Sequence, residues 1–587
     1  MSIVGLQGQP NTWTATRVDM TGTSALYAGD PEPEYVDINN DNTAVMTMQE
    51  NNHLVLVHLP SAKITAQFTA GAIDLTDIDT TEEDPARILL TETQTKRLRE
   101  PDGVSWITNK LFATANEGDM DGGSRSFSIF DTDGQVIFDS GNALDHQAVR
   151  VGHYPDARSG NKGTEPENVE FANFGNIPHL IVAEERSNLL AVYDVTDPRA
   201  PTFKQVLPAG VGPEGVLAIP SRNLLVAASE VDSRGDAVRS VLNLYRYSSE
   251  PARYPTIESI DDADGRPIPW SALSGLAAGD AANTLYSIED SFYGSNRIFT
   301  IDTSTKPAKL IAATPIMDSN GVLAALPVAG LADASVKADD PSRIDVFDEA
   351  DLAAMITPDK HVNLDPEGIA MAADGGFWIV SEGAGTVGDA SRPVNSVNLL
   401  IKTNHQGVIE RVVRLPAEVE KIQVRFGFEG VAEHAGKVYV AFQRAWTGEA
   451  EPRIGVFDTV TADWSFLRYP LDPRESPNGG WVGLSDLTSL GDGRFLVVER
   501  DNQGGPDARI KRLYRFDIQG LIDGDTVAKT LVRDILPELK ALGGPVPEKI
   551  EGLAVMANGD VFVVNDNDGV DDNNGETQLM NLGAIQP

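Results

Sequence analysis

The chain has 587 residues, 41% of them hydrophobic and none cysteine, and its 87 acidic against 47 basic residues give a net charge of −40. This charge argues against nucleic acid and anionic membranes as partners, because phosphates are bound by basic surfaces. The absence of cysteine excludes disulfides, thiolate metal sites and cysteine nucleophiles, and no segment reaches the roughly 18–20 apolar residues of a membrane span. The length predicts several domains or an array of repeats.

The first residues carry no targeting signal that can be recognised. The segment 1–8 lacks the basic and apolar regions of a signal peptide. The residues alone therefore leave two locations open: the cytosol, or export with the leader removed.

An acidic residue at the start of a predicted strand recurs along the chain, and a second acid or amide follows about fifteen residues later. The nine strand starts, of which Ser274 is a degenerate copy, are marked by Glu34, Asp102, Glu167, Glu214, Ser274, Glu367, Glu429, Asp486 and Glu551. Each copy contains glycine or Asn-Gly turns between short strands rich in β-branched and aromatic residues. Four antiparallel strands that recur every 45–65 residues or so are typical of β-propeller blades.

Helix patterns are few and short. The best are at residues 348–356 and 535–542, and both are expected as insertions between strands. The predicted fold class is therefore all-β, a β-propeller of about nine four-stranded repeats, as one large ring or as two tandem propellers. The last repeat stops after its third strand, so residues 12–18 are a candidate for the fourth strand of a closed ring.

The repeated acids are predicted to meet. In a blade the first strand is innermost and the second returns antiparallel to it, so the start of one and the end of the other lie at the same end of the channel. A ring of carboxylates there is costly unless cations or protons neutralise it, and Ca²⁺ is the first choice for oxygen ligands. Residues 116–123 and 565–576 are the densest acidic clusters, although neither has EF-hand spacing and both also fit solvated turns.

Basic residues beside the acidic signals are candidates for binding a phosphate. These are Arg125, Arg425, Arg500 and Lys549, and surface or ion-pair roles are the alternative for each. The eight histidines show no zinc-ligand spacing, and no serine elbow or phosphate-binding glycine loop is present.

At these residues the sequence resembles two bacterial families. The segments 365–383, 428–443, 483–502 and 549–568, such as FEGVAEHAGKVYVAFQ, are similar to the "esterase-like activity of phytase" family. In the first half ATANEGD (113–119), KGTEPENV (162–169) and residues 212–230 resemble the choice-of-anchor I propeller family, which is often found in secreted proteins called alkaline phosphatases. The resemblance divides the chain into domains 1–255 and 256–587.

The resemblance implies an exported protein, periplasmic or extracellular, that acts on a small-molecule phosphate ester or another ester. The match has departures. EPEN stands at 165–168 in place of the usual EPEG, the acidic insertion after ANEGD is short, and the metal signature of calcium-dependent propeller phytases is not recognisable. The substrate therefore stays open.

These observations lead to one main hypothesis and two alternatives. The main hypothesis is a Ca²⁺-dependent phosphoric-ester hydrolase in which Glu367, Glu429, Asp486 and Glu551 are catalytic and the four basic residues bind substrate. The metal ligands are expected among Glu117, Asp119, Glu167, Glu214, Glu382, Glu499, Asp566 and Asp568. The alternatives are a non-catalytic exported propeller with structural Ca²⁺ that serves as a binding platform, and a lactonase-type propeller hydrolase.

Overall fold

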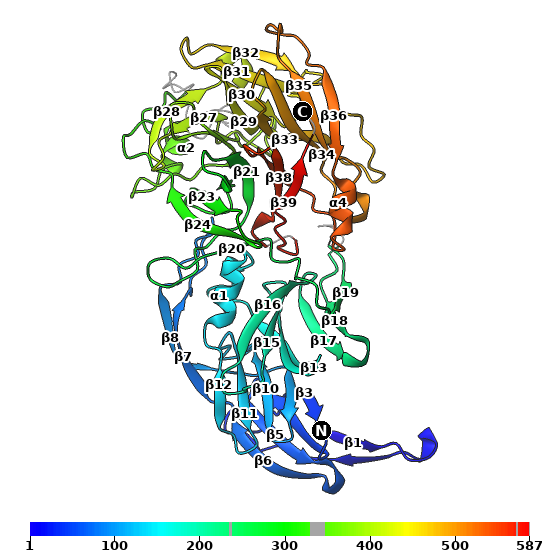
Figure 1. The fold of residues 1–587 in the computed structure, drawn as a ribbon. Helices are drawn as coiled ribbons and strands as arrows, with labels where there is room; N and C mark the ends of the chain where they lie inside the picture. Colours follow the sequence, from blue (N-terminus) through cyan, green and yellow to red (C-terminus); the bar gives the residue numbers. More distant parts are fainter. Residues whose placement is uncertain (234–237, 329–346, 571–572, 586–587) are drawn as a thin grey trace. The chain divides into compact units, whose positions relative to one another are not determined.

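A computed structural model describes residues 1–233, 238–328, 347–570 and 573–585. The contacts divide it into two compact units; in Figure 1 most of the first unit runs from blue to blue-green and most of the second from green to red. Unit 1 comprises Met1–Pro255, Asp261–Pro269 and Asp568–Glu576, and unit 2 comprises Thr256–Ile260, Trp270–Asn567 and Thr577–Pro587. Each unit is built of radially repeated antiparallel sheets.

Unit 1 contains four blade-like sheets and two hairpins. Its inner strands β3, β9, β13 and β17 contact one another in chain order. The first blade contains β3 (Pro33–Ile38), β4 (Thr43–Met48), β5 (His53–His58) and β6 (Lys63–Thr69), and the second contains β9 (Val104–Thr108), β10 (Leu111–Asn116), β11 (Ser126–Asp131) and β12 (Val136–Asp139). The third contains β13 (Pro166–Phe174), β14 (Ile177–Glu184), β15 (Leu189–Asp194) and β16 (Thr202–Pro208). The fourth contains β17 (Pro213–Ile219), β18 (Leu224–Ser229) and β19 (Val241–Arg246). The hairpins are β1 (Ser2–Gly5) with β2 (Thr14–Arg17) and β7 (Ala72–Ile78) with β8 (Glu92–Leu98).

Unit 2 is a five-bladed propeller. Its inner strands contact in the order β21, β25, β29, β33, β37, and β37 contacts β21, which closes the ring. The first blade contains β21 (Leu273–Ala278), β22 (Thr284–Glu289), β23 (Arg297–Asp302) and β24 (Ala308–Pro315), with β20 (Ile257–Ser259) added parallel to β24. The second contains β25 (Pro366–Met371), β26 (Phe377–Ser381), β27 (Leu399–Thr403) and β28 (Ile409–Arg414), and the third contains β29 (Phe428–His434), β30 (Lys437–Phe442), β31 (Arg453–Asp458) and β32 (Trp464–Arg468). The fourth contains β33 (Val482–Ser489), β34 (Arg494–Asp501), β35 (Lys511–Asp517) and β36 (Lys529–Asp534), and the fifth contains β37 (Ile550–Val555), β38 (Asp560–Asn565) and β39 (Met580–Ala584).

The prediction of an all-β propeller with about nine blade-like repeats is confirmed, with four sheets in unit 1 and five in unit 2. The proposed closing strand is wrong, because residues 14–17 pair with β1 and the last blade has three strands. The α-helices are α1 (Ala143–Arg150), α2 (Glu349–Ala354), α3 (Ala417–Glu420) and α4 (Leu536–Ala541), of which α2 and α4 were expected. The 3-10 turns are η1 (Pro10–Thr12), η2 (Leu59–Ser61), η3 (Asp156–Arg158), η4 (Pro220–Arg222), η6 (Gly505–Asp507) and η7 (Asp568–Val570). No helix of the described residues is long and apolar enough to cross a membrane.

The recurring acidic signal has a structural cause in the inner strands. Eight of the described inner strands have a register shift where the signal lies, for example between Pro366 and Gly368 and between Ile550 and Gly552. Such a bulge turns a side chain out of the regular alternation. The side chain of the acid at the bulge therefore does not point into the blade.

The glycine beside the acid allows adjacent inner strands to approach each other. A Cβ atom at Gly368 would lie 2.3 Å from the Glu429 carbonyl oxygen, and one at Gly430 would lie 2.3 Å from the Leu487 backbone nitrogen. In unit 1 a Cβ at Gly103 would lie 2.6 Å from Cα of Asn168. The Glu-Gly pair is therefore a packing requirement of a narrow ring as well as a carrier of charge.

The hydrophobic core lies between successive blades. One cluster joins the β21–β24 and β25–β28 sheets through residues such as Ile288 and Ile379, and another joins β25–β28 to β29–β32 through Val380 and Phe442. These side chains are almost fully buried. Packing between blades fixes the inner strands, and with them the positions of the acids.

Candidate functional site

The acids of unit 2 gather at the channel end where the inner strands begin. We call this group the mouth cluster, and its members are Asp290, Asp365, Glu367, Glu382, Glu429, Glu551 and Asp566. Carboxylate oxygens of Asp365, Glu367 and Glu382 lie within 4.8 Å of one another. Asp365 and Glu367 flank Pro366 at the start of β25, and Glu382 directly follows β26, so one hairpin supplies all three.

Neutral donors, not cations, bind the three carboxylates. Ser274 Oγ donates to Glu367 Oε2 at 2.9 Å, the backbone N–H of Gly427 donates to Glu382 Oε1 at 2.6 Å, and Ser291 donates to Asp365. Among the described residues, no lysine or arginine lies within ion-pair distance of these three acids. Hard divalent cations prefer such oxygen ligands, so the donor set fits Ca²⁺ or a similar ion.

Burial and mutual repulsion perturb the acids of the mouth cluster. Burial raises the pKa of Glu367 well above its usual value, and the charge of Glu429 raises it further. The pKa of Glu382 is raised by burial and then by Asp365, and that of Glu429 by burial and then by Glu551. In the absence of a cation, burial and mutual repulsion therefore favour the protonated forms of these acids.

Two ion pairs lie in the deeper part of the mouth cluster. Arg500 donates through Nη2 to Glu551, and both side chains are almost completely buried. Lys549 Nζ lies 2.9 Å from Asp566 Oδ2. The sequence placed Arg500 and Lys549 near the acids as substrate ligands, and the structure shows that both already neutralise a carboxylate.

Asp486 has a different environment from the other predicted catalytic acids. It is fully buried, and its carboxylate accepts from the backbone N–H groups of Leu276, Leu487 and Leu553 at 3.3, 2.7 and 2.7 Å. These donors lie on β21, β33 and β37, so one carboxylate ties three blades together across the channel. We therefore assign Asp486 a positioning role in the ring and leave it out of the proposed catalytic group.

A column of arginine and aromatic side chains lies beside the mouth cluster. The Arg444 guanidinium carbon is 4.7 Å from the Phe426 ring centroid and 5.0 Å from that of Trp481. Arg425 lies over Phe426 at 4.6 Å, and Arg500 over Trp481 at 5.5 Å. Burial lowers the pKa of Arg444, and the charge of Arg425 lowers it further. In the described chain neither Arg425 nor Arg444 has a carboxylate within ion-pair distance.

Unit 1 has its own acidic group, which we call the unit 1 cluster: Asp102, Glu117, Glu165, Glu167 and Glu185, together with Lys162. Lys162 Nζ lies 2.6 Å from Glu117 Oε1 and 3.5 Å from Glu165 Oε2. Arg158 pairs with Glu165 at 2.6 Å, and Arg186 pairs with Glu185 at 2.9 Å. The chain itself therefore supplies cations for Glu117, Glu165 and Glu185.

A proton is shared within the same cluster. The side chains of Asp102 and Glu167 are hydrogen bonded to each other. Burial raises the pKa of Glu167 to about 10, helped by the hydrogen bond that its carboxyl donates to Asp102, and burial raises the pKa of Asp102 to about 6. The two carboxyls behave as a pair that keeps one proton at neutral pH.

The remaining predicted residues do not belong to the mouth cluster. Arg125 is fully buried in unit 1, where it pairs with Asp145 at 3.1 Å and donates to the Asp79 carbonyl. Glu499 faces away from its neighbour Arg500 and binds Lys529 at 2.6 Å. Three further residues belong to unit 1: Glu214, hydrogen bonded to Glu230; Asp119, bonded to Glu50 on an exposed loop; and Asp568, in the turn η7. Residues 571–572 of the acidic segment lie outside the described residues.

Several residues of these sites were not chosen from the sequence. Asp365 and Asp290 directly adjoin recurring signals, Asp365 two residues before Glu367 and Asp290 one residue after Glu289. Arg444 follows the terminal amide Gln443 of its repeat in the same way. A search of the positions next to each signal would have found these three, whereas the stacking of Phe426 and Trp481 depends on contacts between blades.

The sheets, their closed inner ring in unit 2 and the acids at one end of the channel define a β-propeller protein with a carboxylate-lined mouth. The family model "Esterase-like activity of phytase" matches residues 268–569, and the chain belongs to this family. The model "Choice-of-anchor I domain" matches residues 6–122 and 120–198, so the two resemblances stated from the sequence are confirmed. Family membership places the chain among propellers described as esterase-like.

Solved structures are similar to this chain only at a low level. A functionally unknown protein from Desulfotomaculum acetoxidans is 12% identical, with 53% of this chain and 77% of that chain covered and a TM-score of 0.25. Virginiamycin B lyase from Staphylococcus aureus is 11% identical, with 81% and 93% covered and a TM-score of 0.20. Hydrazine synthase from Kuenenia stuttgartiensis is 12% identical, with 80% and 100% covered and a TM-score of 0.24. Comparison with curated proteins gave no match.

Proposed function

We propose that the protein is a divalent-cation-dependent hydrolase of phosphoric esters, with Ca²⁺ as the first candidate, and that its active site is the mouth cluster of unit 2. One observation carries this proposal. Three carboxylates converge within 4.8 Å without an internal cation, beside two arginines that have no carboxylate partner among the described residues. A cation at the acids and an anion at the arginines would complete both groups.

The acids offer a set of ligands that suits a cation better than a proton alone. Asp365, Glu367 and Glu382 would hold the ion, and their repulsion, which now raises each pKa, would become attraction to it. A bound divalent cation lowers the pKa of a coordinated water and offsets the charge of phosphoryl oxygens. Because the ligands must lose their protons, the affinity for the ion should increase with pH.

The arginines are suited to an oxyanion. A guanidinium group that stacks on aromatic rings keeps its N–H edges free to donate to phosphate oxygens in pairs. Arg444 is fixed between Phe426 and Trp481, and Arg425 adjoins Phe426. In a chain of net charge −40 this local excess of positive charge is unusual, and it would hold the phosphoryl group against repulsion from the rest of the protein.

Glu429 and Glu551 also belong to the mouth cluster but are not among the three proposed cation ligands. Glu429 accepts a hydrogen bond from Gln443 Nε2, and Glu551 is held by Arg500. Because burial and Glu551 raise the pKa of Glu429, its protonated form is favoured, and this carboxyl can donate a proton to the departing oxygen of the ester. Arg500 and Lys549 would keep Glu551 and Asp566 charged and in place.

The test is hydrolysis of p-nitrophenyl phosphate, bis(p-nitrophenyl) phosphate and a lactone by the purified full chain, with EDTA and with added Ca²⁺. The proposal expects cation-dependent turnover of a phosphate ester that Glu382→Gln abolishes and Glu117→Gln leaves within twofold. Turnover of the lactone alone would favour the lactonase alternative. No turnover, with a melting temperature that EDTA lowers, would favour a binding platform with structural Ca²⁺. Export to the periplasm or the medium stays a prediction.

A further inference from the structure

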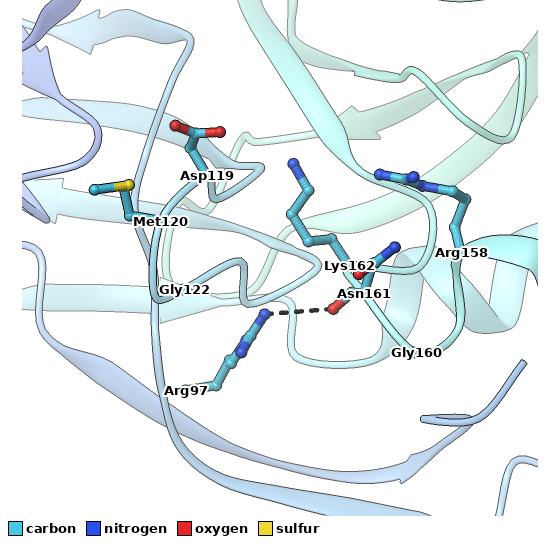
Figure 2. A pocket seen from close by; sticks show the side chains of 8 residues that line it. All are labelled: Arg97, Asp119, Met120, Gly122, Arg158, Gly160, Asn161 and Lys162. Atoms are coloured by element: carbon cyan, nitrogen blue, oxygen red, sulfur yellow. Dashed lines mark hydrogen bonds between the residues drawn. The ribbon is translucent and has the colours of Figure 1, made fainter.

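Unit 1 has a pocket that the proposed function does not use. It has a volume of about 440 Å³, and its lining is almost entirely polar. Figure 2 shows its eight lining residues: Arg97, Asp119, Met120, Gly122, Arg158, Gly160, Asn161 and Lys162. Three of these are cationic and one is acidic, in a protein whose acids outnumber its bases by 87 to 47.

Arg97 is the feature that points to a ligand. This side chain, on β8, donates through Nε to the Gly123 carbonyl at 3.1 Å and through Nη2 to the Asn161 carbonyl at 3.3 Å, the bond drawn in Figure 2. In the part of the chain that the structure describes, no carboxylate lies within ion-pair distance of it. Burial lowers the pKa of Arg97 and nearby Arg125 lowers it further, while the charges of Glu100 and Asp121 act in the opposite direction without forming an ion pair with it among the described residues.

Arg158 and Lys162, the other two cations, each bind a carboxylate of the unit 1 cluster. Arg158 uses Nε for Glu165, and among the described residues its terminal nitrogens have no hydrogen-bond partner. Lys162 is held by Glu117 and the Gly118 carbonyl, each at 2.6 Å. These carboxylates fix the two cations from behind. Three positive groups that come from β8 and from the segment 158–162 therefore meet at one pocket.

The acidic side of the pocket is a loop built to a fixed shape. The buried Glu100 carboxylate accepts from the backbone N–H groups of Asp119 and Asp121, each at 2.8 Å. A Cβ atom at Gly118 would lie 2.2 Å from Gly123, and one at Gly122 would lie 2.7 Å from the Glu100 carboxyl carbon. The loop is thus closed on itself around Glu100. Asp119, the only acid of the lining, is exposed at the edge.

We propose that this pocket binds a small oxyanion of the phosphate or sulfate class, with Arg97 as its main ligand and Arg158 and Lys162 as supporting donors. Guanidinium and ammonium groups donate short, charge-assisted hydrogen bonds to such anions. A polar lining offers nothing to an apolar ligand, and three cations exclude a metal ion from the pocket itself. This site belongs to the choice-of-anchor half and does not depend on activity in unit 2.

The experiment is isothermal titration of the full chain with inorganic phosphate, sulfate and chloride at constant ionic strength. It is run in the Arg444→Gln background, which weakens anion binding in unit 2. Phosphate or sulfate is expected to bind, and Arg97→Gln is expected to weaken binding by about tenfold or more, since charge-assisted hydrogen bonds are lost. Arg199→Gln, which replaces an exposed arginine of unit 1 outside the pocket lining, is the matched control and should bind like its parent.

A second variant covers the case in which Arg97→Gln does not fold. Met120 lines the pocket and is 54% exposed, so Met120→Glu adds a negative charge without disturbing the core, and Met120→Gln is its neutral control. Binding should fall about tenfold in Met120→Glu relative to Met120→Gln. Preference for phosphate or for sulfate would identify the kind of oxyanion. Equal affinity in all four variants, or no heat with any of the three anions, would overturn the proposal.

Discussion

The two units place similar acids at the same point of similar blades, but they neutralise them differently. In unit 1, Lys162, Arg158 and Arg186 reach the carboxylates of Glu117, Glu165 and Glu185. In unit 2, the three converging acids are Asp365, Glu367 and Glu382, and within the described ranges they meet only neutral donors. Carboxylates that pair with cations of the same chain need no ligand, whereas buried carboxylates without such partners require a proton or a bound cation.

The difference lies in a few positions and not in the fold. Both groups lie at a bulge at the start of an inner strand, where unit 1 has Glu167-Asn168 and unit 2 has Glu367-Gly368. Lys162 stands three residues before Glu165, whereas the residue three positions before Asp365 is Val362. Lys162, Arg158 and Arg186 thus distinguish the unit 1 cluster from the candidate metal site of unit 2, and substitutions in either unit can test this claim.

The largest effect is expected from the mouth cluster. Glu367→Gln or Glu382→Gln should lower kcat/KM for the phosphate ester by about 100-fold or more, because each removes a charged ligand from the ion that activates the reaction. Glu117→Gln in unit 1 should change it by less than about twofold. Steady-state kinetics with saturating Ca²⁺ measures both. Equal losses in the two units would contradict the distinction between them.

Removal of Lys162 should give the unit 1 cluster an affinity for Ca²⁺. Lys162→Met leaves Glu117 without its partner and weakens the support of Glu165, which should cost about 2–4 kcal/mol of unfolding free energy. Millimolar Ca²⁺ should restore part of this loss in the variant and leave unit 1 of the parent unaffected. Thermal unfolding of both proteins with EDTA and with Ca²⁺ checks this. A Lys162→Met protein that is as stable as its parent would remove the role given to Lys162.

Proton release should distinguish the mouth cluster from a preformed ion pair. Burial and mutual repulsion raise the pKa values of Glu367 and Glu382, so protons compete with a bound cation for these acids. The apparent affinity for Ca²⁺ should therefore rise by about tenfold or less per pH unit between pH 6 and pH 8. Titration in buffers of different ionisation enthalpy counts the protons. Affinity that is independent of pH would show that the three acids are already ionised.

The smallest effect concerns the proton pair of unit 1. The pKa of Glu167 is raised from 4.5 to about 10, so the folded protein keeps a proton that the unfolded chain releases. Stability from this group is complete below pH 4.5 and is lost as pH rises towards 10. Glu167→Gln should raise Tm at pH 8 by about 2–4 °C, which corresponds to about 1 kcal/mol after screening by water, and should not do so at pH 4. Melting at the two pH values tests this, with Glu250→Gln, which replaces an exposed acid of unit 1, as a control. A Tm increase of the same size at both values would argue against a shared proton.

The sequence predicted the blades and the end of the channel at which the acids lie, because both depend on a local signal. Gly368 and Glu367 show why: the glycine is required for close approach of strands, and its neighbour is turned out by the bulge. The roles of individual residues could not be predicted in this way. Arg125 and Arg500 stand beside acidic signals, but each is buried against a carboxylate from a distant part of the chain. Asp486 carries the signal too, yet three backbone N–H groups occupy it.

Equilibrium Ca²⁺ binding to the full chain tests the central claim most directly. The parent should bind an ion that Glu382→Gln no longer binds and that Glu117→Gln binds with unchanged affinity. The same result should hold when Asp365→Asn replaces Glu382→Gln, since both residues belong to the same group of ligands. Loss of Ca²⁺ binding in Glu117→Gln with retention in Glu382→Gln would place the ion in unit 1 and contradict the account.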